Sequence, residues 1–358
     1  MAYTTIDNPE LYFQTKLYTG QASSQGDGTT TAITFDGDED MQPDLICIKN
    51  RDGTDWHDVT DSVRGVTKSI FPNVTDAEET AATSVTAIGS DGFTVGSSDQ
   101  VNDASDKYVA WCWKAGTTGS GTTTGSGTGK AYSYSVSTTA GFSIVKYIGN
   151  GTSAHTIPHH LGAVPQWVLI KETSNASDWM GYHIGIGNTH TIKLNEPDAP
   201  VDRTDWWNDT TPTSSVVTLG DNGEINQDDT DYVMYSFSNI QGFGKFDSYT
   251  GNGNADGPFI HTGFSPSFVM THNTETASQW TMWDNKRTAN SNLKDEVLYA
   301  NGTNAEATAA TESVDFLSNG FKIRGNNSGI NTSGEKYIYM AFAEAPFVNS
   351  KGAPANAR

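Results

Sequence analysis

Basic residues are scarce in this sequence, and their scarcity limits the partners that the chain can bind. Lys and Arg together account for 21 of the 358 residues, whereas Asp and Glu account for 42, so the formal net charge is −21. Binding to a nucleic-acid backbone depends on Lys and Arg side chains that neutralise phosphates. Because the few basic residues do not cluster, we expect no nucleic-acid partner and an acidic, well-solvated surface.

Long hydrophobic runs and paired cysteines are also missing. No stretch approaches the roughly 20 apolar residues of a membrane-spanning helix, so we expect no membrane insertion. The N-terminal stretch MAYTTIDNPELYFQTK has neither the basic start nor the apolar core of a secretory signal, which predicts synthesis in a cytoplasm. The two cysteines, Cys47 and Cys112, lack CxxC spacing and are expected to be buried free thiols.

The residues that are abundant favour β-structure. Gly contributes 36 residues, and Thr, Ser, Asn and Asp are frequent. Thr, Val, Tyr, Phe and Trp favour strands, while Gly, Asn, Asp and Ser favour turns. Runs that suit a helix are almost absent, so the composition predicts an all-β protein.

One stretch occurs three times, at residues 92–113, 216–237 and 320–342. Each copy begins with an apolar-x-apolar strand seed, passes through a Gly-bearing turn to an apolar-Asn pair, and reaches a Tyr six residues later. The Asn and Tyr of the copies are Asn102 and Tyr108, Asn226 and Tyr232, and Asn331 and Tyr337. The period is too long for a solenoid, so each copy should belong to a whole small domain. The predicted fold is three tandem lectin-like or jelly-roll β-sandwich units of about 100 residues.

The repeats and the polar segments beside them set the predicted domain boundaries. These are an N-terminal arm at 1–17, a first repeat at 18–116, a Gly/Ser/Thr linker at 117–131, a second repeat at 132–245, a third repeat at 246–348 and a C-terminal tail at 349–358. The linker composition is typical of a flexible tether. No comparable tether separates the second and third repeats, which should therefore pack as one rigid body.

An acidic loop near the N-terminus imitates the first half of a calcium-binding loop. Asp36, Asp38 and Asp40 have the alternating spacing that such loops use. Met41 stands where the loop needs Gly, and Cys47 stands where it needs Glu. A solvated acidic loop is the favoured interpretation, with an irregular cation site as the alternative.

Histidines cluster at His155, His159 and His160, but the spacing does not support a metal site. Pro158 prevents a helix that would present His155 and His159 on one face, so a turn leading into a strand fits better. The chain also lacks the GxSxG and HExxH patterns of hydrolases. We therefore expect a protein that is not an enzyme and that uses no metal and no cofactor.

Aromatic residues with acidic neighbours are the remaining candidates for ligand binding. Trp56, Trp179 and Trp280 follow the Pro-led strand of each repeat, and a second pair of Trp residues lies in a long polar loop. Repeated Trp residues often form cores, but an exposed ring beside Asp or Asn also suits the grip on a sugar. The predicted ligand-binding residues are Trp179, Trp206, Trp207, Trp280, Asp205 and Asp284.

Several segments together resemble a β-rich repeat family of tail-fibre and virion structural proteins of marine tailed phages, including phages of cyanobacteria. They are MAYTTID at the N-terminus and the segments at 61–68, 90–93, 108–111, 113–116, 140–144, 248–253 and 337–342. The resemblance implies a virion location and other virion proteins as partners.

Within that class, the favoured expectation is a tail-fibre or tail-associated adhesin. Such a protein would form a homo-oligomer, a trimer above all, and would bind host cell-surface polysaccharide. A capsid decoration protein is the alternative, and a virion enzyme that cleaves glycans is a second alternative.

Overall fold

The computed structural model describes residues 3–288 and 291–354, and it confirms the all-β fold class. The strands pair antiparallel within every sheet of these ranges. Among the described residues, helical structure is limited to single turns: η1 (Pro9–Leu11), α1 (Asp99–Asn102), α2 (Thr204–Trp207), α3 (Gly223–Asn226), η2 (Ala310–Glu312) and α4 (Ser328–Asn331). The sheets fall into three groups, which we name unit 1 (13–113), unit 2 (117–237) and unit 3 (244–346).

Unit 1 contains a four-stranded sheet, a three-stranded sheet and a two-stranded ribbon. In spatial order these are β1 (Phe13–Thr19), β9 (Lys107–Trp113), β3 (Leu45–Asn50) and β4 (Asp58–Asp61); β2 (Thr31–Ile33), β8 (Gly92–Val95) and β7 (Val85–Gly89); and β5 (Lys68–Ser69) with β6 (Glu79–Thr80). Alternating side chains of the two larger sheets face each other across an apolar layer.

Unit 2 has the largest sheet, with eight strands. Its order is β10 (Thr117–Thr122), β12 (Ala131–Ser137), β13 (Phe142–Ile148), β20 (Asp231–Phe237), β15 (Trp167–Glu172), β16 (Trp179–His183), β17 (His190–Lys193) and β18 (Val201–Asp202). A three-stranded sheet completes the unit with β11 (Thr124–Gly125), β14 (His155–Pro158) and β19 (Val216–Leu219).

Unit 3 combines a six-stranded and a four-stranded sheet. The first has the order β21 (Gly244–Thr250), β30 (Lys336–Pro346), β23 (Phe264–Asn273), β24 (Thr281–Asp284), β26 (Glu296–Tyr299) and β27 (Ala307–Thr308). The second has the order β22 (Phe259–His261), β29 (Gly320–Ile323), β28 (Val314–Leu317) and β25 (Leu293–Lys294).

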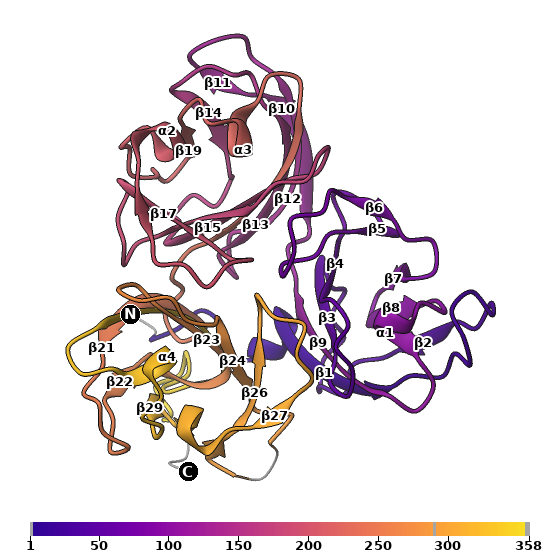
Figure 1. Cartoon of the computed structure of the whole chain (residues 1–358), viewed down its shortest axis with the longest axis vertical. Coiled ribbons are helices and arrows are strands. Elements are labelled where there is room, and N and C mark those ends of the chain that lie inside the picture. The colour runs from indigo at the N-terminus through magenta and orange to yellow at the C-terminus, as the bar shows by residue number, and fades with distance from the viewer. Residues whose placement is uncertain (1–2, 289–290, 355–358) are drawn as a thin grey trace.

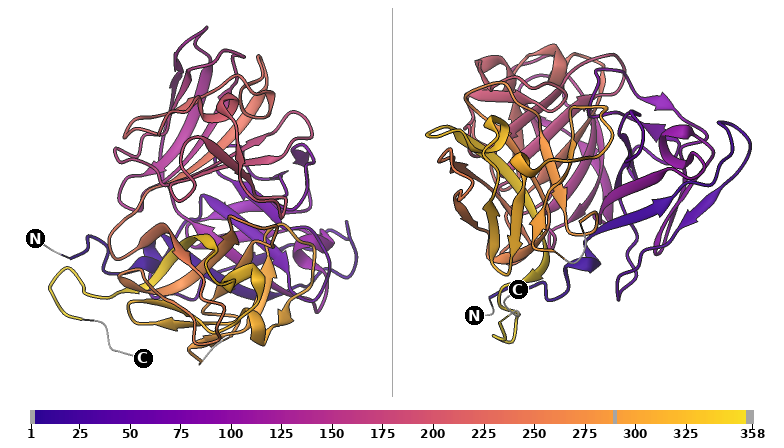
Figure 2. Two further views of the ribbon diagram at one scale, coloured as in Figure 1. Left: turned by 60° about the vertical axis from the view of Figure 1, so that its left-hand side comes forward. Right: turned by 60° about the horizontal axis from the view of Figure 1, so that its bottom comes forward.

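The units form three lobes around a common junction (Figure 1). Two further views show the same close association of the lobes (Figure 2). One continuous hydrophobic cluster joins all three units and includes Phe13, Trp113, Phe237, Phe268 and Phe342. Two smaller clusters fill the interiors of units 1 and 2. The junction therefore is a shared core rather than a set of surface contacts.

The repeated Tyr takes the same place in each unit. Each lies opposite another Tyr on the neighbouring strand, and the two rings stack: Tyr18 with Tyr108 at 5.1 Å, Tyr147 with Tyr232 at 5.2 Å, and Tyr249 with Tyr337 at 5.0 Å between centroids. The pairing explains why every copy of the repeated stretch keeps a Tyr at this position.

The repeated Asn ends the single-turn helix α1, α3 or α4 and is fully buried. Its amide nitrogen donates to a Gly carbonyl, and its Oδ1 accepts a backbone N–H from the chain segment that enters the unit. The Gly acceptors are Gly96, Gly220 and Gly325, and the N–H donors are Gln21, Asn150 and Asn252. A buried amide with all its groups bonded fixes the turn, because an unsatisfied one would be costly.

Two of the predicted boundaries need correction. The segment at 117–131 is not a flexible tether, because β10 pairs with β12 along its whole length and β11 pairs with β14. The N-terminal arm is also shorter than predicted, because β1 already begins at Phe13. The arm itself packs on unit 3, where the hydroxyl of Tyr3 donates to the carbonyl of Gly263 at 3.0 Å.

Candidate functional site at the junction of the three units

The structure buries five of the six residues that were predicted to bind a ligand. The exposed fractions are 2% for Trp179, 4% for Trp206, 1% for Trp207, 2% for Trp280 and 2% for Asp284. A sugar ring stacks on an aromatic face that solvent can reach, and these four rings present no such face. The prediction of a glycan-binding surface at these residues is therefore wrong.

Trp206 and Trp207 lie in the helical turn α2 rather than in an extended loop. In an extended segment they would point to opposite faces, but both rings here enter the core of unit 2. The guanidinium of Arg203 lies over the Trp206 ring, 5.1 Å from its centroid, and pairs with Asp205. Burial alone would raise the pKa of Asp205, but a hydrogen bond from Asn222 and the Arg203 charge hold it below its ordinary value.

Trp179 and Trp280 belong to a closed ring of hydrogen bonds between the units. In each unit an aromatic N–H at the first residue of the equivalent strand (β4, β16 or β24), or at the residue directly before it, donates to a backbone carbonyl of another unit. The bonds run from Trp179 Nε1 to Phe71 O at 2.8 Å, from Trp280 Nε1 to Lys193 O at 3.0 Å, and from His57 Nε2 to Tyr299 O at 3.0 Å. Unit 2 thus donates to unit 1, unit 3 to unit 2, and unit 1 to unit 3, so that the ring closes.

The acceptor segments are equivalent as well. An Asn stands two residues after each acceptor carbonyl. Its Oδ1 accepts the backbone N–H of His57, Trp179 or Trp280, whichever belongs to the same unit as the Asn. These Asn residues are Asn73, Asn195 and Asn301, and the donors are the backbone N–H groups of His57, Trp179 and Trp280. The same local geometry therefore recurs at all three joints.

His57, and not the neighbouring Trp56, occupies the equivalent position in unit 1. Burial, the largest effect, and the Lys49 charge lower the pKa of His57 to about 3, so its ring is neutral. A carbonyl oxygen can only accept, so the Nε2 atom of His57 must carry the proton. The spacing could have revealed this residue, because Asp61, His183 and Asp284 each lie four positions after the ring residue.

A second set of contacts across the junction starts from those three residues. Each one bonds a neighbouring unit: Asp61 accepts from the Tyr235 hydroxyl at 2.6 Å, Asp284 accepts from Trp111 Nε1 at 3.2 Å, and His183 donates through Nε2 to the Tyr339 carbonyl at 3.2 Å. Asp61 thus connects unit 1 to unit 2, His183 connects unit 2 to unit 3, and Asp284 connects unit 3 to unit 1.

The chemistry of each contact matches the residue on the other side. Trp111 and Tyr235 occupy equivalent positions on β9 and β20, and both carry a polar donor that suits an Asp. Met340 occupies that position on β30 and has no donor. The residue of unit 2 that faces unit 3 is His183 rather than an Asp, and it donates to the Tyr339 backbone carbonyl. Burial lowers the pKa of His183 to about 4, which keeps the ring neutral for that bond.

Arginines support the two acidic residues. Arg64 pairs with Asp61 at 2.5 Å and Arg287 pairs with Asp284 at 2.6 Å, and all four side chains are buried. Burial alone would raise the pKa of Asp284, but the Arg287 charge holds it below its ordinary value. Breaking such a buried pair leaves an uncompensated charge, which typically costs about 3–5 kcal/mol. These pairs are therefore structural parts of the junction.

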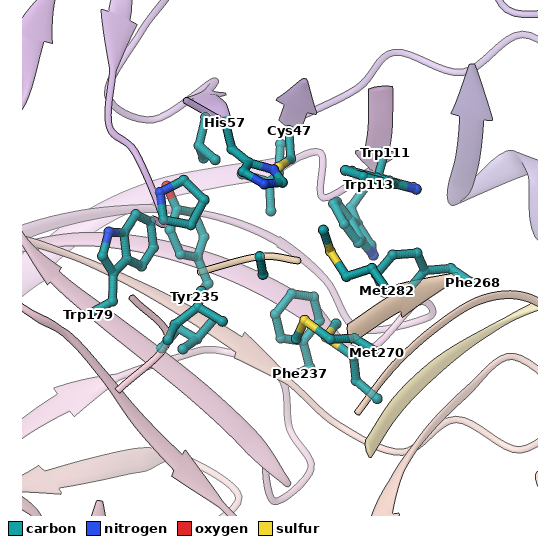
Figure 3. Close-up of a pocket in the computed structure, with 17 residues that line it drawn as sticks. Cys47, His57, Trp111, Trp113, Trp179, Tyr235, Phe237, Phe268, Met270 and Met282 are labelled. Atoms are coloured by element: carbon teal, nitrogen blue, oxygen red, sulfur yellow. The ribbon is translucent and has the colours of Figure 1, made fainter. Parts of the chain in front are cut away.

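A small cavity of about 90 Å³ lies at the junction, lined by side chains of all three units (Figure 3). Its labelled walls are Cys47, His57, Trp111, Trp113, Trp179, Tyr235, Phe237, Phe268, Met270 and Met282. Burial raises the pKa of the Cys47 thiol to about 12, and His57 is neutral, so neither group is charged near pH 7. The cavity therefore offers apolar packing space rather than acid–base chemistry.

The three clustered histidines do not converge on one point. His155 bonds Asn226 and Thr123, His159 bonds the Thr213 carbonyl, and His160 stacks on Tyr134 at 3.8 Å. Within residues 3–288 and 291–354, no group of three or more His, Cys, Asp or Glu side chains could hold a metal ion.

The acidic loop at 36–40 also has local partners. The Asp36 carboxylate pairs with Lys16 at 3.5 Å, and the backbone N–H of Asp38 bonds Glu10. Both cysteines are free, as expected, and Cys112 is buried while Cys47 is partly buried. In the described part of the chain, no helix is long and apolar enough to cross a membrane.

Comparison with known proteins gives a family but no function. The model of a family described as a domain of unknown function (DUF7483) matches residues 8–346. The chain belongs to this family. No curated protein and no solved structure matches it. The match covers all three units, which agrees with their shared core.

Proposed function

We propose that this protein is a structural component of a phage particle, in which it serves as a rigid three-lobed body that joins other particle proteins. The observation that carries the proposal is the closed ring of hydrogen bonds from His57, Trp179 and Trp280. Each joint adds about 1 kcal/mol to a continuous apolar core, so the lobes are held in fixed positions. Fixed lobes suit a load-bearing connector, and the resemblance to virion structural proteins points in the same direction.

The arrangement of the three units also bears on the expectation that the protein forms a homotrimer. One chain already supplies three related units around a common core, so a threefold body does not require three copies. We propose that the working form is a single chain that contacts neighbouring particle proteins with its outer surfaces. The aromatic rings that would have made it a glycan-binding adhesin are buried instead, Trp179 and Trp280 in the junction and Trp206 and Trp207 in the core of unit 2.

The proposal is tested by locating the protein in purified particles. We expect electron microscopy of antibody-labelled particles to place it at a fixed position, and quantitative mass spectrometry to give a constant copy number per particle. Its absence from purified particles would overturn the proposal. Shortening of host polysaccharide by the purified chain would favour the enzyme alternative.

Variants of the junction sharpen the test. Trp179→Phe combined with Trp280→Phe removes two joints of the ring while keeping aromatic cores. Trp56→Phe is the matched control, because the Trp56 ring packs against Phe71 at a tilt of 56° and Trp56 is not one of the three donors of the hydrogen-bond ring. We expect the control to enter particles at the normal level and the double variant to enter at a reduced level. Equal incorporation of both would show that rigidity of the junction is irrelevant to the role.

A further inference from the structure

The outer side of unit 2 is closed by a segment that units 1 and 3 lack. Residues 117–137 add β12 and β10 beyond β13 in the large sheet, and β11 beyond β14 in the small one. In unit 1 the equivalent strands, β1 and β2, are the last strands of their sheets. The sheet edge that β12 covers in unit 2 is therefore uncovered at the equivalent strand β1 in unit 1.

A groove of about 390 Å³ occupies the open side of unit 1, between β1 and β2. It is lined by Lys16, Leu17, Tyr18, Thr19, Gln21, Thr31, Ala32, Ile33 and Thr34. Tyr18 and Tyr147 hold equivalent positions, and each hydroxyl donates at 2.7 Å to the carbonyl of an equivalent residue. Tyr147 has no exposed surface, whereas Tyr18 is partly exposed. The covering strand β12 accounts for that difference.

The free hydrogen-bonding groups of β1 can be assigned from its pairing. The Gly20 N–H bonds the Asp106 carbonyl at 2.9 Å, on the side of β9. Successive residues of a strand point their N–H groups to opposite sides, so the N–H groups of Leu17 and Thr19 face the groove side. Natural proteins usually cover or block such an edge, because it pairs readily with another strand.

Unit 3 shows a blocked version of the same edge. Ser248 precedes Tyr249 as Leu17 precedes Tyr18, and its N–H is bonded by Asp247 Oδ1 at 2.9 Å. Unit 2 covers its edge with a strand and unit 3 caps it with a carboxylate. Lys16 is the basic residue of β1, but its charge is paired with the Asp36 carboxylate at 3.5 Å. The edge of unit 1 is thus the one prepared for pairing.

We infer that the groove of unit 1 binds an extended segment of another protein, which adds to β1 as an antiparallel strand. Its expected chemistry follows β12, whose sequence AYSYSVS alternates small side chains, one Ala and three Ser, with aromatic or aliphatic ones and carries no charge. Main-chain bonds to Leu17 and Thr19 would give affinity, and a side chain over Tyr18 would give specificity. That the partner is a particle protein rests on the proposed function, whereas the docking itself does not.

A synthetic peptide with the sequence AYSYSVS and blocked ends tests the docking on the full-length protein. Hydrogen–deuterium exchange at the Leu17 and Thr19 amides should slow by on the order of tenfold at saturating peptide. Exchange along β21 of unit 3 should not change. A control peptide with Pro in place of its first two Ser residues lacks the required N–H groups and should protect nothing. Failure of AYSYSVS to protect β1, or equal protection of β21, would overturn the inference.

Two variants separate docking from folding. Leu17→Pro removes an outward N–H while leaving the bonds from β1 to β9 in place. Ala32→Arg fills the groove from the opposite side and leaves β1 unchanged. Phe259→Arg is the matched control, because Phe259 holds the equivalent exposed position on β22 of unit 3. We expect both groove variants to lose peptide binding and the control to keep it.

Two further outcomes identify what occupies the groove. If sedimentation shows a dimer that Leu17→Pro abolishes, the occupant is a second copy of this chain and the inference of another protein is wrong. If the peptide binds but the protein is absent from purified particles, the docking site stands and the proposed function fails. If peptide binding survives Ala32→Arg and Leu17→Pro, the site does not lie in this groove.

Discussion

The indole of Trp111 in unit 1 donates to the carboxylate of Asp284 in unit 3 across 3.2 Å, although 172 residues lie between them. The same carboxylate is paired with Arg287, whose guanidinium lies 5.8 Å from the centroid of the Trp111 ring. The charge and the ring therefore stabilise each other at one point. Because Trp111 belongs to the first unit and Asp284 to the last, this contact closes the body from one end of the chain to the other.

Removal of one joint of the ring should destabilise the whole protein. Trp280→Phe keeps an aromatic side chain but leaves the Lys193 carbonyl without its donor. We expect the free energy of unfolding to fall by about 1–3 kcal/mol. Chemical denaturation measures the change, with Trp56→Phe as the control that should change little. A loss confined to unit 3, with units 1 and 2 unaffected, would contradict a shared core.

The hydroxyl of Tyr235 should contribute through its bond to Asp61. Hydrogen bonds to charged groups contribute about 1.5–3 kcal/mol, so we expect Tyr235→Phe to lower the stability by that amount. Tyr182 is a suitable control, because it is buried in the same unit but packs in the separate core cluster of unit 2 rather than in the junction. Equal effects of Tyr235→Phe and Tyr182→Phe in thermal unfolding would show that the Asp61 contact adds nothing.

The parts of the fold that depend on local pattern were predictable from the sequence. The spacing from Asn226 to Tyr232, with its two counterparts, indicated three equivalent strands, and the register places those Tyr residues opposite Tyr partners. The strand composition predicted the fold class for the same reason, because strand propensity is a property of short segments.

Contacts between units were not predictable, because they depend on where whole sandwiches pack. Trp179 and Trp280 were recognised as a repeated feature, but their burial follows from the lobes that cover them. Trp206 and Trp207 were misplaced because a polar loop was assumed where a helical turn forms. The Gly/Ser/Thr segment was taken for a linker because its strand state depends on pairing with β12.

The cavity at the junction should accept a larger side chain. Ala300 lines its wall, and the cavity volume of about 90 Å³ exceeds the added volume of two methyl groups. We expect Ala300→Val to raise the free energy of unfolding by about 0.5–2 kcal/mol, as other cavity-filling changes do. Urea denaturation checks this expectation. A loss of stability would mean that the space next to Ala300 is not open to its side chain.

Stability should decrease as the pH falls below neutrality, because several buried histidines resist protonation, among them His57, His183 and His272. Burial lowers the pKa of His57 to about 3 and those of His183 and His272 to about 4, against an ordinary value of 6.5. The unfolded chain therefore takes up protons between pH 6.5 and about 4 while the folded protein does not, and this favours unfolding. Asp44 and Asp58 act in the opposite direction, because burial raises the pKa of each carboxyl.

A single substitution isolates one histidine from these opposing effects. His183→Gln keeps an N–H that can donate to the Tyr339 carbonyl but cannot titrate. Between pH 6.5 and 4, the stability of the variant should fall less steeply than that of the parent, by about 1.4 kcal/mol per pH unit. Denaturation curves at several pH values measure both slopes, and His190→Gln is the control because His190 is only partly buried. Parallel slopes for His183→Gln and the parent would show that His183 is protonated as easily in the folded protein as in the unfolded chain. That result would contradict a neutral His183 ring that donates to the Tyr339 carbonyl.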